Sequence, residues 1–515
     1  MTERLSAAER ALLAPARDAD PSPIPAQVIS NGEFLPAPQG ELQRKFASRL
    51  RERADIQAKR HGIPRRAFLC TASGMAAAFL AMNDVYGPIF RVSEAEAADA
   101  ELGDEHAGKL SDQFVFDCHT HFLKDDTRLQ YFVDLRTDTG QRGYNAELAK
   151  HRQTFKDVKF PNYIKEMFLD SDTKVAVLSG APSDLPQDWM LSNDAIRDAC
   201  DRVNKFAGSR RMLPHFIFAP GQDGWLDAID RGIEVLKPIG WKGYTIGDNT
   251  HKEISRYPCL MDDEKVTYKG YEKFDKAGIR VVAVHKGLFP PSDQALFANL
   301  TRYAKVDDVG KAAKDWPQLN FLIYHAGYRY TGDDNPALAA KQFDETGRMD
   351  WVSDLAEVPA KYGVSNVYAD VGASFAAICL SQPRGAAAMM GILIKGLGAD
   401  HGCGALLAMV RFAAMADRGV SPHGDPRRDA KKPRLCCTRR CQRRGQAGDS
   451  WHQRCQGIRR AGPARRCRLA PRRPRLDARR LSRRRPAAEQ CRLRVCAGGV
   501  KPHPALSRFA ASTAK

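Results

Sequence analysis

The sequence of 515 residues lacks three features, each of which would point to a different class of protein. It has no apolar run of the roughly 20 residues that a membrane-spanning helix needs, because the best candidate, 64–82, is short and weakly apolar. It has no glycine-rich loop after its first apolar run, which argues against a doubly wound nucleotide-binding fold. It also has no cysteine framework, and the body of the chain is therefore not predicted to be stapled by disulfides. The cysteines before residue 403 are scattered at Cys70, Cys118, Cys200, Cys259 and Cys379.

An excess of positive charge is absent from most of the chain, although the formal net charge is +19. Residues 403–515 contain 30 Lys and Arg against 6 Asp and Glu, whereas the remaining residues contain 50 against 55. The same stretch holds eight cysteines in no zinc-like spacing. The mildly acidic body predicts no specific nucleic-acid binding, and the tail is predicted to be disordered. The predicted segments are a polar leader (1–63), a signal region (64–98), a folded body (112–402) and a basic tail (403–515).

Seven short apolar runs rich in β-branched residues follow one another through the body, with helix-compatible segments between them. Near-continuous apolar runs of this kind are typical of a parallel sheet that is buried on both faces. Seven of them over about 260 residues indicate an α/β fold, a TIM-barrel-like (β/α)8 barrel whose eighth strand is missing. The predicted strands are 114–122, 174–180, 213–220, 241–247, 279–287, 320–327 and 366–372.

Several of these runs end in histidine, at the end of the strands where barrel enzymes build their sites. His119 and His121 are two residues apart, so both side chains point to one side of the strand and can bind one metal ion. Asp117 shares that side and could orient a metal ligand. His285, at the end of the fifth run, would complete a three-histidine set. This leaves His325, at the end of the sixth, as a general acid or base.

Other polar residues near these strand ends have two interpretations each. Asp370 is interpreted as capping its strand, with a substitute carboxylate ligand as the alternative. Lys286 and Arg329 lie beside strand-end histidines and are either structural or bind a substrate carboxylate. Lys242 and Cys118 are interpreted as structural, the cysteine as a core thiol on the side of its strand opposite the histidines.

Three motifs, HTH at 119–121, VHKG at 284–287 and YHAG at 324–327, occur in an order that resembles the metal-dependent amidohydrolase superfamily. The most similar branch contains aminocarboxymuconate-semialdehyde decarboxylase and related hydrolases, and the resemblance covers about residues 112–402. It implies a divalent metal, usually zinc, and a water bound and activated by that metal. It also implies that Lys242 is not carboxylated, because the carboxylated lysine belongs to other branches. The residues that the resemblance assigns are His119, His121 and His285 to the metal and His325 to catalysis.

Residues 64–82, PRRAFLCTASGMAAAFLAM, resemble a twin-arginine export signal. The usual Ser or Thr before the arginines is Pro64 here, the leader is unusually long, and small residues follow at 95–98. The resemblance implies export to the periplasm by the twin-arginine translocation machinery. An amphipathic N-terminal helix is the alternative interpretation. The residues that match the motif are Arg65, Arg66, Phe68 and Leu69.

The resemblance to the amidohydrolases breaks off after residues 394–401. In that family an eighth strand follows and ends in a metal-binding aspartate, but here the sequence becomes rich in arginine, proline and cysteine. One interpretation is a natural basic tail that binds nucleic acid or anionic lipid. A shift of reading frame close to residue 402 fits the composition better. Codons exist for 415–431 that, read one base later, encode an amphipathic helix like the one that the family carries there. A chain without the strand and its aspartate is predicted to fold poorly and to be inactive or nearly so.

Together these features predict a metal-dependent hydrolase in which metal-bound water attacks a carbonyl-type carbon of a small molecule, with His325 as proton shuttle. Its activity is predicted to be impaired by the missing aspartate. A non-oxidative decarboxylase of an aromatic or muconate-type acid is the alternative, because it would use the same residues. A nucleic-acid- or membrane-binding protein that acts through its basic tail is a third interpretation, which leaves the ordered histidines unexplained. Substrate, metal identity and homo-oligomerisation stay open.

Overall fold

The computed structural model describes residues 23–24, 40–111, 114–141, 148, 152–330, 335–379 and 382–403. The predicted basic tail after Cys403 and most of the first 39 residues of the predicted leader lie outside the described residues. The predictions of a disordered tail and of a shifted reading frame concern that part of the chain and stay predictions.

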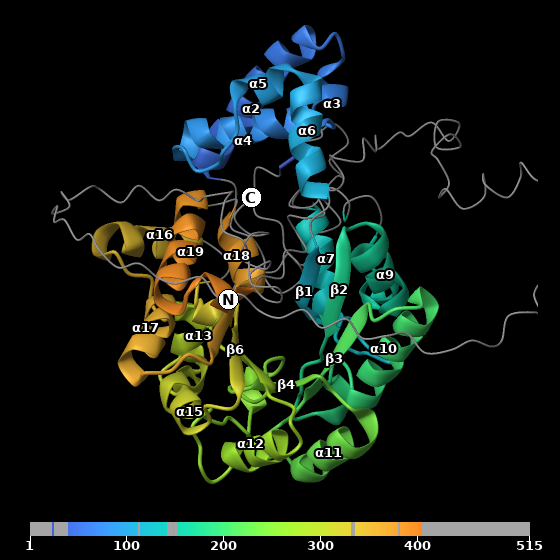
Figure 1. Cartoon of the computed structure of the whole chain (residues 1–515), viewed down its shortest axis with the longest axis vertical. Helices are drawn as coiled ribbons and strands as arrows, with labels where there is room; N and C mark the ends of the chain where they lie inside the picture. Colours follow the sequence, from blue (N-terminus) through green and yellow to red (C-terminus); the bar gives the residue numbers. More distant parts are fainter. Residues whose placement is uncertain are drawn as a thin grey trace, which may run out of the picture. The chain divides into compact units, whose positions relative to one another are not determined.

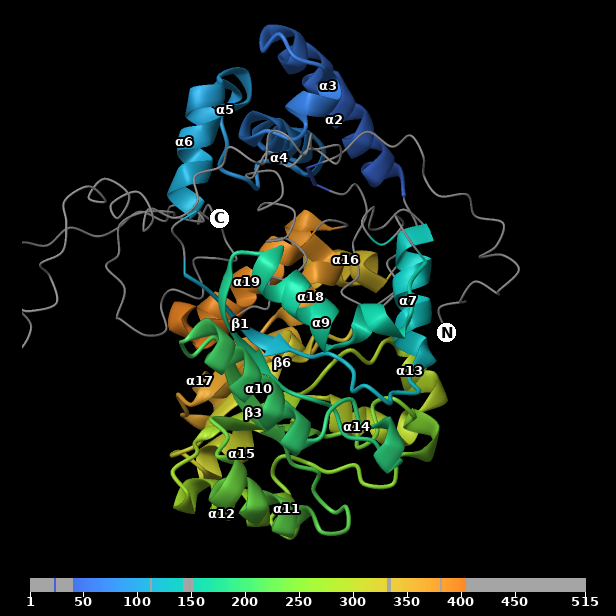
Figure 2. The ribbon, with the colours of Figure 1, turned by 90° about the vertical axis from the view of Figure 1, so that its right-hand side faces the viewer.

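Eight parallel strands form one sheet, and their order in the sheet is their order along the chain. The first seven confirm the seven predicted apolar runs. Figure 1 shows these strands within an arc of helices, with α10, α11, α12, α15 and α17 on its outer side, and Figure 2 shows the same arrangement from the side. The strands are β1 (Val115–Thr120), β2 (Thr173–Leu178), β3 (Met212–Ile217), β4 (Gly240–Tyr244), β5 (Val281–His285), β6 (Asn320–Tyr324), β7 (Val367–Asp370) and β8 (Gly402–Cys403).

The last of these strands corrects the prediction that an eighth strand is missing. Gly402 and Cys403 form a two-residue strand that pairs in parallel with Ala369 and Asp370 of β7. Neither of these described residues carries a carboxylate, so this part of the strand supplies no metal-binding aspartate. Within the described ranges no pairing joins β8 to β1, and the sheet is open between its first and last strands there.

Helices alternate with the strands, as a sheet of parallel neighbours requires. The α-helices of this part are α7 (Gln130–Gln141), α9 (Phe160–Ile164), α10 (Asn193–Ala207), α11 (Trp225–Arg231), α12 (Thr267–Lys276), α13 (Pro291–Leu296), α14 (Thr301–Ala304), α15 (Val309–Asp315), α16 (Asn335–Thr346), α17 (Val352–Tyr362), α18 (Gly372–Cys379) and α19 (Pro383–Leu397). Shorter 3-10 and π turns are η1 (Phe155–Val158), η2 (Lys165–Leu169), η3 (Pro186–Asp188), η4 (Gly232–Leu236), η5 (Lys252–Ile254), η6 (Ala298–Leu300), η7 (His325–Gly327) and η8 (Ala399–His401).

The main core lies between the sheet and these outer helices. Trp241 of β4 stacks on Phe274 of α12, with 4.6 Å between ring centroids, and both rings are fully buried. Phe216 of β3 packs edge-on against Trp241, and Tyr271 packs edge-on against Phe321 of β6. Burying aromatic side chains of this size stabilises the fold by roughly 2 kcal/mol or more each. This layer fixes β3 to β6 in register and thereby places their carboxyl ends side by side.

The residues before the sheet form a group of helices around α4, which packs against α2, α5 and α6. The amphipathic α2 buries Phe46 and Leu50, and Arg53 on this helix bonds to Asp84 and Glu94 at 2.8 Å each. In the described residues no helix is long and apolar enough to cross a membrane. The helices are α2 (Glu41–Arg60), α3 (Arg65–Phe68), α4 (Ala72–Tyr86), α5 (Glu94–Ala98) and α6 (Ala100–Ser111).

The predicted export signal, residues 64–82, covers α3 and most of α4. Phe68 and Leu69 are buried, and Arg65 forms an ion pair with Asp55 of α2 at 2.8 Å. The motif residues are thus packed against the helix that precedes them. Export by the twin-arginine route stays a prediction, because these contacts are equally compatible with an ordinary helical segment.

Candidate active site

The structure brings the four predicted histidines together at the carboxyl ends of β1, β5 and β6. The centroid of the His119 ring lies 5.1 Å from that of His121 and 5.1 Å from that of His325, and 4.6 Å separates the rings of His285 and His325. His119, His285 and His325 are buried. Four imidazoles from three strands therefore form one contiguous cluster, which we call the histidine cluster.

His325 is held in the cluster by an unusual backbone. His325 and Ala326 both have left-handed φ angles, 61° and 51°, which are uncommon for residues with a Cβ. Such a conformation costs of order 1–3 kcal/mol for each residue and tends to persist where a functional side chain must be aimed. The tight turn η7 points the His325 ring back toward His119 and His285 instead of continuing the direction of β6.

Gly287, the glycine of the VHKG motif, allows the segment after His285 to pack closely against the segment after His325. Gly287 has a φ of +75°, and a Cβ on it would lie 2.5 Å from the carbonyl oxygen of Tyr328 and 2.6 Å from the carbonyl carbon of Gly327. Only a residue without a side chain allows this approach. The next residue, Leu288, donates its N–H to the same Tyr328 oxygen at 2.7 Å. The backbones that follow β5 and β6 are thus locked side by side, which fixes His285 relative to His325.

His119 lies between an acidic and a basic side chain. Its Nδ1 is 2.9 Å from Oδ2 of Asp370, and its Nε2 is 3.0 Å from Nζ of Lys242. The ring of Tyr324 stacks on it, with 3.9 Å between centroids. Burial, and next the charge of Lys242, hold the pKa of His119 well below its ordinary value. The imidazole is therefore neutral, the form that binds a metal.

Two aspartate side chains, those of Asp370 and Asp117, hold His119 in place. Asp370 is fully buried and bonds to His119 rather than only capping β7, and Cys118 donates its Sγ–H to the other Asp370 oxygen at 3.5 Å. Cys118 is buried as predicted, but it contacts this site carboxylate. Asp117 accepts the backbone N–H of His119 at 3.0 Å, and burial raises its pKa to about 8. Both aspartates thus orient the first histidine of the HTH motif.

Lys242, which the sequence led us to interpret as structural, is a residue of the site. It lies in the middle of β4, is fully buried, and reaches both His119 and the hydroxyl of Ser179, the latter at 3.4 Å. Its ammonium also lies over the rings of Tyr244 and Tyr324, 4.9 and 4.6 Å from their centroids. A lysine inside a run as apolar as WKGYTIG was the available signal, because a buried lysine needs partners.

The two predicted substrate-binding residues do not join the histidine cluster. Lys286 follows His285 on the opposite side of the chain, where its ammonium is buried against Asp308 at 2.7 Å and the Tyr303 carbonyl at 2.9 Å. Neighbouring residues of a strand point to opposite faces, which is the reason for the separation. Arg329 is paired with Asp350 at 2.8 Å. Both cations already have carboxylate partners within the protein.

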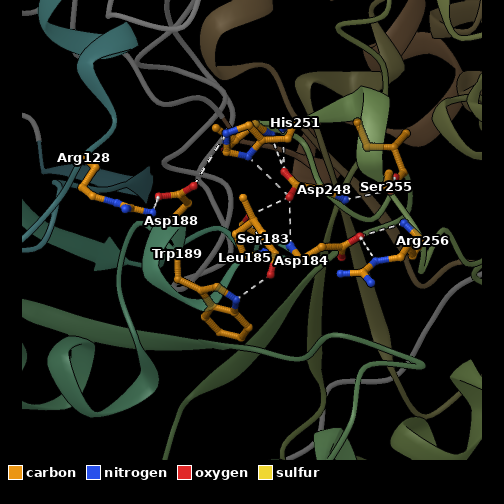
Figure 3. Close-up of polar contacts among 12 residues, drawn as sticks. Arg128, Ser183, Asp184, Leu185, Asp188, Trp189, Asp248, His251, Ser255 and Arg256 are labelled. Atoms are coloured by element: carbon orange, nitrogen blue, oxygen red, sulfur yellow. Dashed lines mark hydrogen bonds and ion pairs between the residues drawn. The ribbon is translucent and has the colours of Figure 1, made fainter.

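A second polar network joins the loops after β2 and β4 (Figure 3). Asp248, fully buried, accepts the hydroxyl of Ser183 at 2.6 Å and the backbone N–H groups of Asp184, Thr250 and His251 at 2.7–2.9 Å. The His251 ring lies 3.6 Å from Asp248. A carboxylate with four donors fixes the two loops at the same end of the sheet as the histidine cluster.

The donor set of the histidine cluster fits a divalent metal by its chemistry. Neutral imidazoles from His119, His121 and His285 are the ligands that zinc and similar ions prefer. Gly372 lies close to the Nδ1 side of His119, since a Cβ there would lie 3.1 Å from Asp370 Oδ2 and 3.5 Å from His119 Nδ1. In the part of the chain that the structure describes, however, no three His, Cys, Asp or Glu side chains are already gathered around one point. The ammonium of Lys242, a cation, lies at the Nε2 that His119 would offer.

Comparisons with known proteins find similar chain paths at low sequence identity. A manganese-containing 5-carboxyvanillate decarboxylase from Novosphingobium aromaticivorans is 15% identical, with 60% of this chain and 91% of that chain covered and a TM-score of 0.34. A 2,6-dihydroxybenzoate decarboxylase is 15% identical, with 60% and 91% covered and a TM-score of 0.33. A candidate amidohydrolase from Staphylococcus aureus is 15% identical, with 62% and 94% covered and a TM-score of 0.31. No protein-family model and no curated protein sequence matches the chain.

Proposed function

We propose that the histidine cluster is the active site of a metal-dependent hydrolase that acts on a carbonyl-type carbon of a small molecule. The observation that supports this most is the convergence of four histidines from β1, β5 and β6, one of them on a left-handed turn. A divalent metal held by His119, His121 and His285 would act there as a Lewis acid, with zinc as the first candidate.

The residues around the proposed ligands have distinct tasks. Asp370 and Asp117 hold the ring and the backbone of His119 in place. His325 is fully buried beside His285 and His119. One of its ring nitrogens takes a proton from the attacking water and then donates this proton to the leaving group. The hydrogen bonds of Asp248 hold the loops after β2 and β4 together at this end of the sheet.

Decarboxylation of an aromatic or muconate-type acid is the second candidate reaction, and Lys286 and Arg329 were predicted to bind its substrate carboxylate. The two predicted cations are bonded elsewhere, Lys286 to Asp308 and Arg329 to Asp350. An uncharged ester, lactone or amide needs no such partner, and we infer that the substrate belongs to this class.

The test measures metal content and turnover of the purified full chain. We expect the His119→Ala/His121→Ala variant to lose the metal. We expect His325→Asn to keep it and to lose about 100-fold of the residual hydrolysis of esters, lactones or amides that the impaired wild-type chain retains. His106→Asn, a change on α6, serves as the matched control. Unchanged metal content in the double variant would overturn the proposal, and carbon dioxide release from carboxylated aromatics without any hydrolysis would replace it with decarboxylation.

A further inference from the structure

The strongest feature that the proposed function does not use is the contact between Lys242 and His119. Lys242 Nζ lies 3.0 Å from His119 Nε2, and both side chains are buried. The ammonium sits between the rings of Tyr244 and Tyr324 and donates also to Ser179 Oγ at 3.4 Å. The protein's own lysine thus occupies the position next to His119 Nε2.

The neighbours of His119 determine which of its nitrogens carries the lone pair. The Asp370 carboxylate only accepts hydrogen bonds, so Nδ1, 2.9 Å away, carries the hydrogen. The Lys242 ammonium only donates, so Nε2 carries the lone pair. A neutral imidazole has one lone pair, and a metal would need this one. Lys242 and a metal are therefore competitors for a single atom.

The two competitors also repel each other. A divalent ion bound to Nε2 would lie within a few ångströms of the ammonium, and in a buried site such repulsion is weakly screened. We propose that Lys242 is a built-in competitor of the metal, so that metal loading requires the lysine to leave His119. This inference rests on the proposed function.

The test compares metal affinities rather than activities. The full chain is stripped with a chelator and titrated calorimetrically with zinc and, separately, with manganese. Lys242→Met keeps the length and the apolar stem but removes the charge, and we expect it to bind zinc roughly tenfold or more tightly than the wild type. Lys314→Met removes the same charge from an exposed position on α15 and should leave the affinity unchanged.

The outcomes separate this inference from the proposed function. Equal or weaker binding by Lys242→Met, with clear binding by the wild type, would overturn the competition and leave the metal site intact. Binding by neither chain would overturn both. Lys242→Gln, whose amide can still bond to Ser179, should bind more tightly than the wild type as well. The glutamine variant keeps the test decisive if Lys242→Met misfolds, and circular dichroism would detect such misfolding.

Discussion

Lys286 follows the proposed metal ligand His285, but its role is structural, because it forms a buried ion pair with Asp308. Asp308 Oδ2 accepts from Lys286 at 2.7 Å and from the backbone N–H of Met261 at 2.8 Å. Lys286→Met would leave the buried Asp308 carboxylate without its cation. We therefore expect the free energy of unfolding, measured by urea denaturation, to fall by about 3–5 kcal/mol. Lys286→Met/Asp308→Asn keeps an acceptor for Met261 and should recover most of this loss.

The same pair of variants tests the earlier substrate-binding prediction for Lys286. If the lysine anchors a substrate, the double variant will be stable but will have a raised KM. If its role is the ion pair alone, stability and KM will both return to near the wild-type values. A single variant as stable as the wild type would contradict the structural assignment.

His215 on β3 gives the fold a defined sensitivity to acid. Burial, followed by the charge of Lys242, lowers its pKa from 6.5 to about 3. The folded state therefore keeps His215 neutral, while the unfolded chain protonates it below about pH 6.5. Stability from this group is complete above that pH and is lost as the pH falls toward 3.

This sensitivity is measurable by urea unfolding at pH 7 and pH 5. Between pH 7 and pH 5 the free energy of unfolding of the wild type should fall by about 2 kcal/mol more than that of His215→Leu. His106→Leu, on α6, is the matched control and should not reduce the loss in this way. Equal losses in the wild type and in His215→Leu would show that His215 is not held neutral by the fold.

Individual residues show what could be predicted from the sequence and what could not. His119, His121, His285 and His325 were predictable, because strand alternation and strand ends are local patterns. The partners of these residues were not. Asp370 reaches His119 from a strand about 250 positions later, and Lys242 reaches it from β4, contacts that only the curvature of the sheet creates.

At the scale of elements, the seven apolar runs were predicted correctly because a doubly buried strand needs an unbroken apolar sequence. The two-residue β8 was missed, since it has no such run and depends on its pairing with β7. The turn η7 was also beyond reach, because its left-handed residues are His325 and Ala326 rather than residues typical of that conformation.

The packing of α17 against α19 depends on one glycine. A Cβ on Gly396 would lie 2.1 Å from the carbonyl oxygen and 2.6 Å from the Cβ of Ala356. Alanine is the better helix former by about 1 kcal/mol, but here the clash outweighs that gain. We expect Gly396→Ala to destabilise the chain by about 1–3 kcal/mol.

Another glycine in a helix provides the opposite control. Gly108 of α6 is exposed, and a Cβ there would meet no atom within 4 Å. Gly108→Ala should therefore raise stability by up to about 1 kcal/mol, the intrinsic helix preference. Thermal unfolding followed by circular dichroism compares the two variants. A stabilised Gly396→Ala would show that the helices can separate at no cost.

For the whole molecule, the last strand is the weakest part of the sheet. β8 has two residues, and the described residues contain no pairing between it and β1. A last strand of two residues leaves the sheet less stable than a barrel closed by a strand of full length. We propose that a shift of reading frame near residue 402 removed the longer eighth strand and its aspartate.

A gene corrected by one base near codon 402 tests this proposal. The restored chain should unfold at least about 5 °C higher, because a full strand closes the sheet and adds buried area. It should also bind zinc more tightly and turn over faster, since an aspartate adds a charged ligand to three neutral imidazoles. A chain ending at Cys403 is the control and should gain nothing. An intact frame in the resequenced gene, or a restored chain that unfolds no higher than the present one, would refute the shift and favour a natural basic tail.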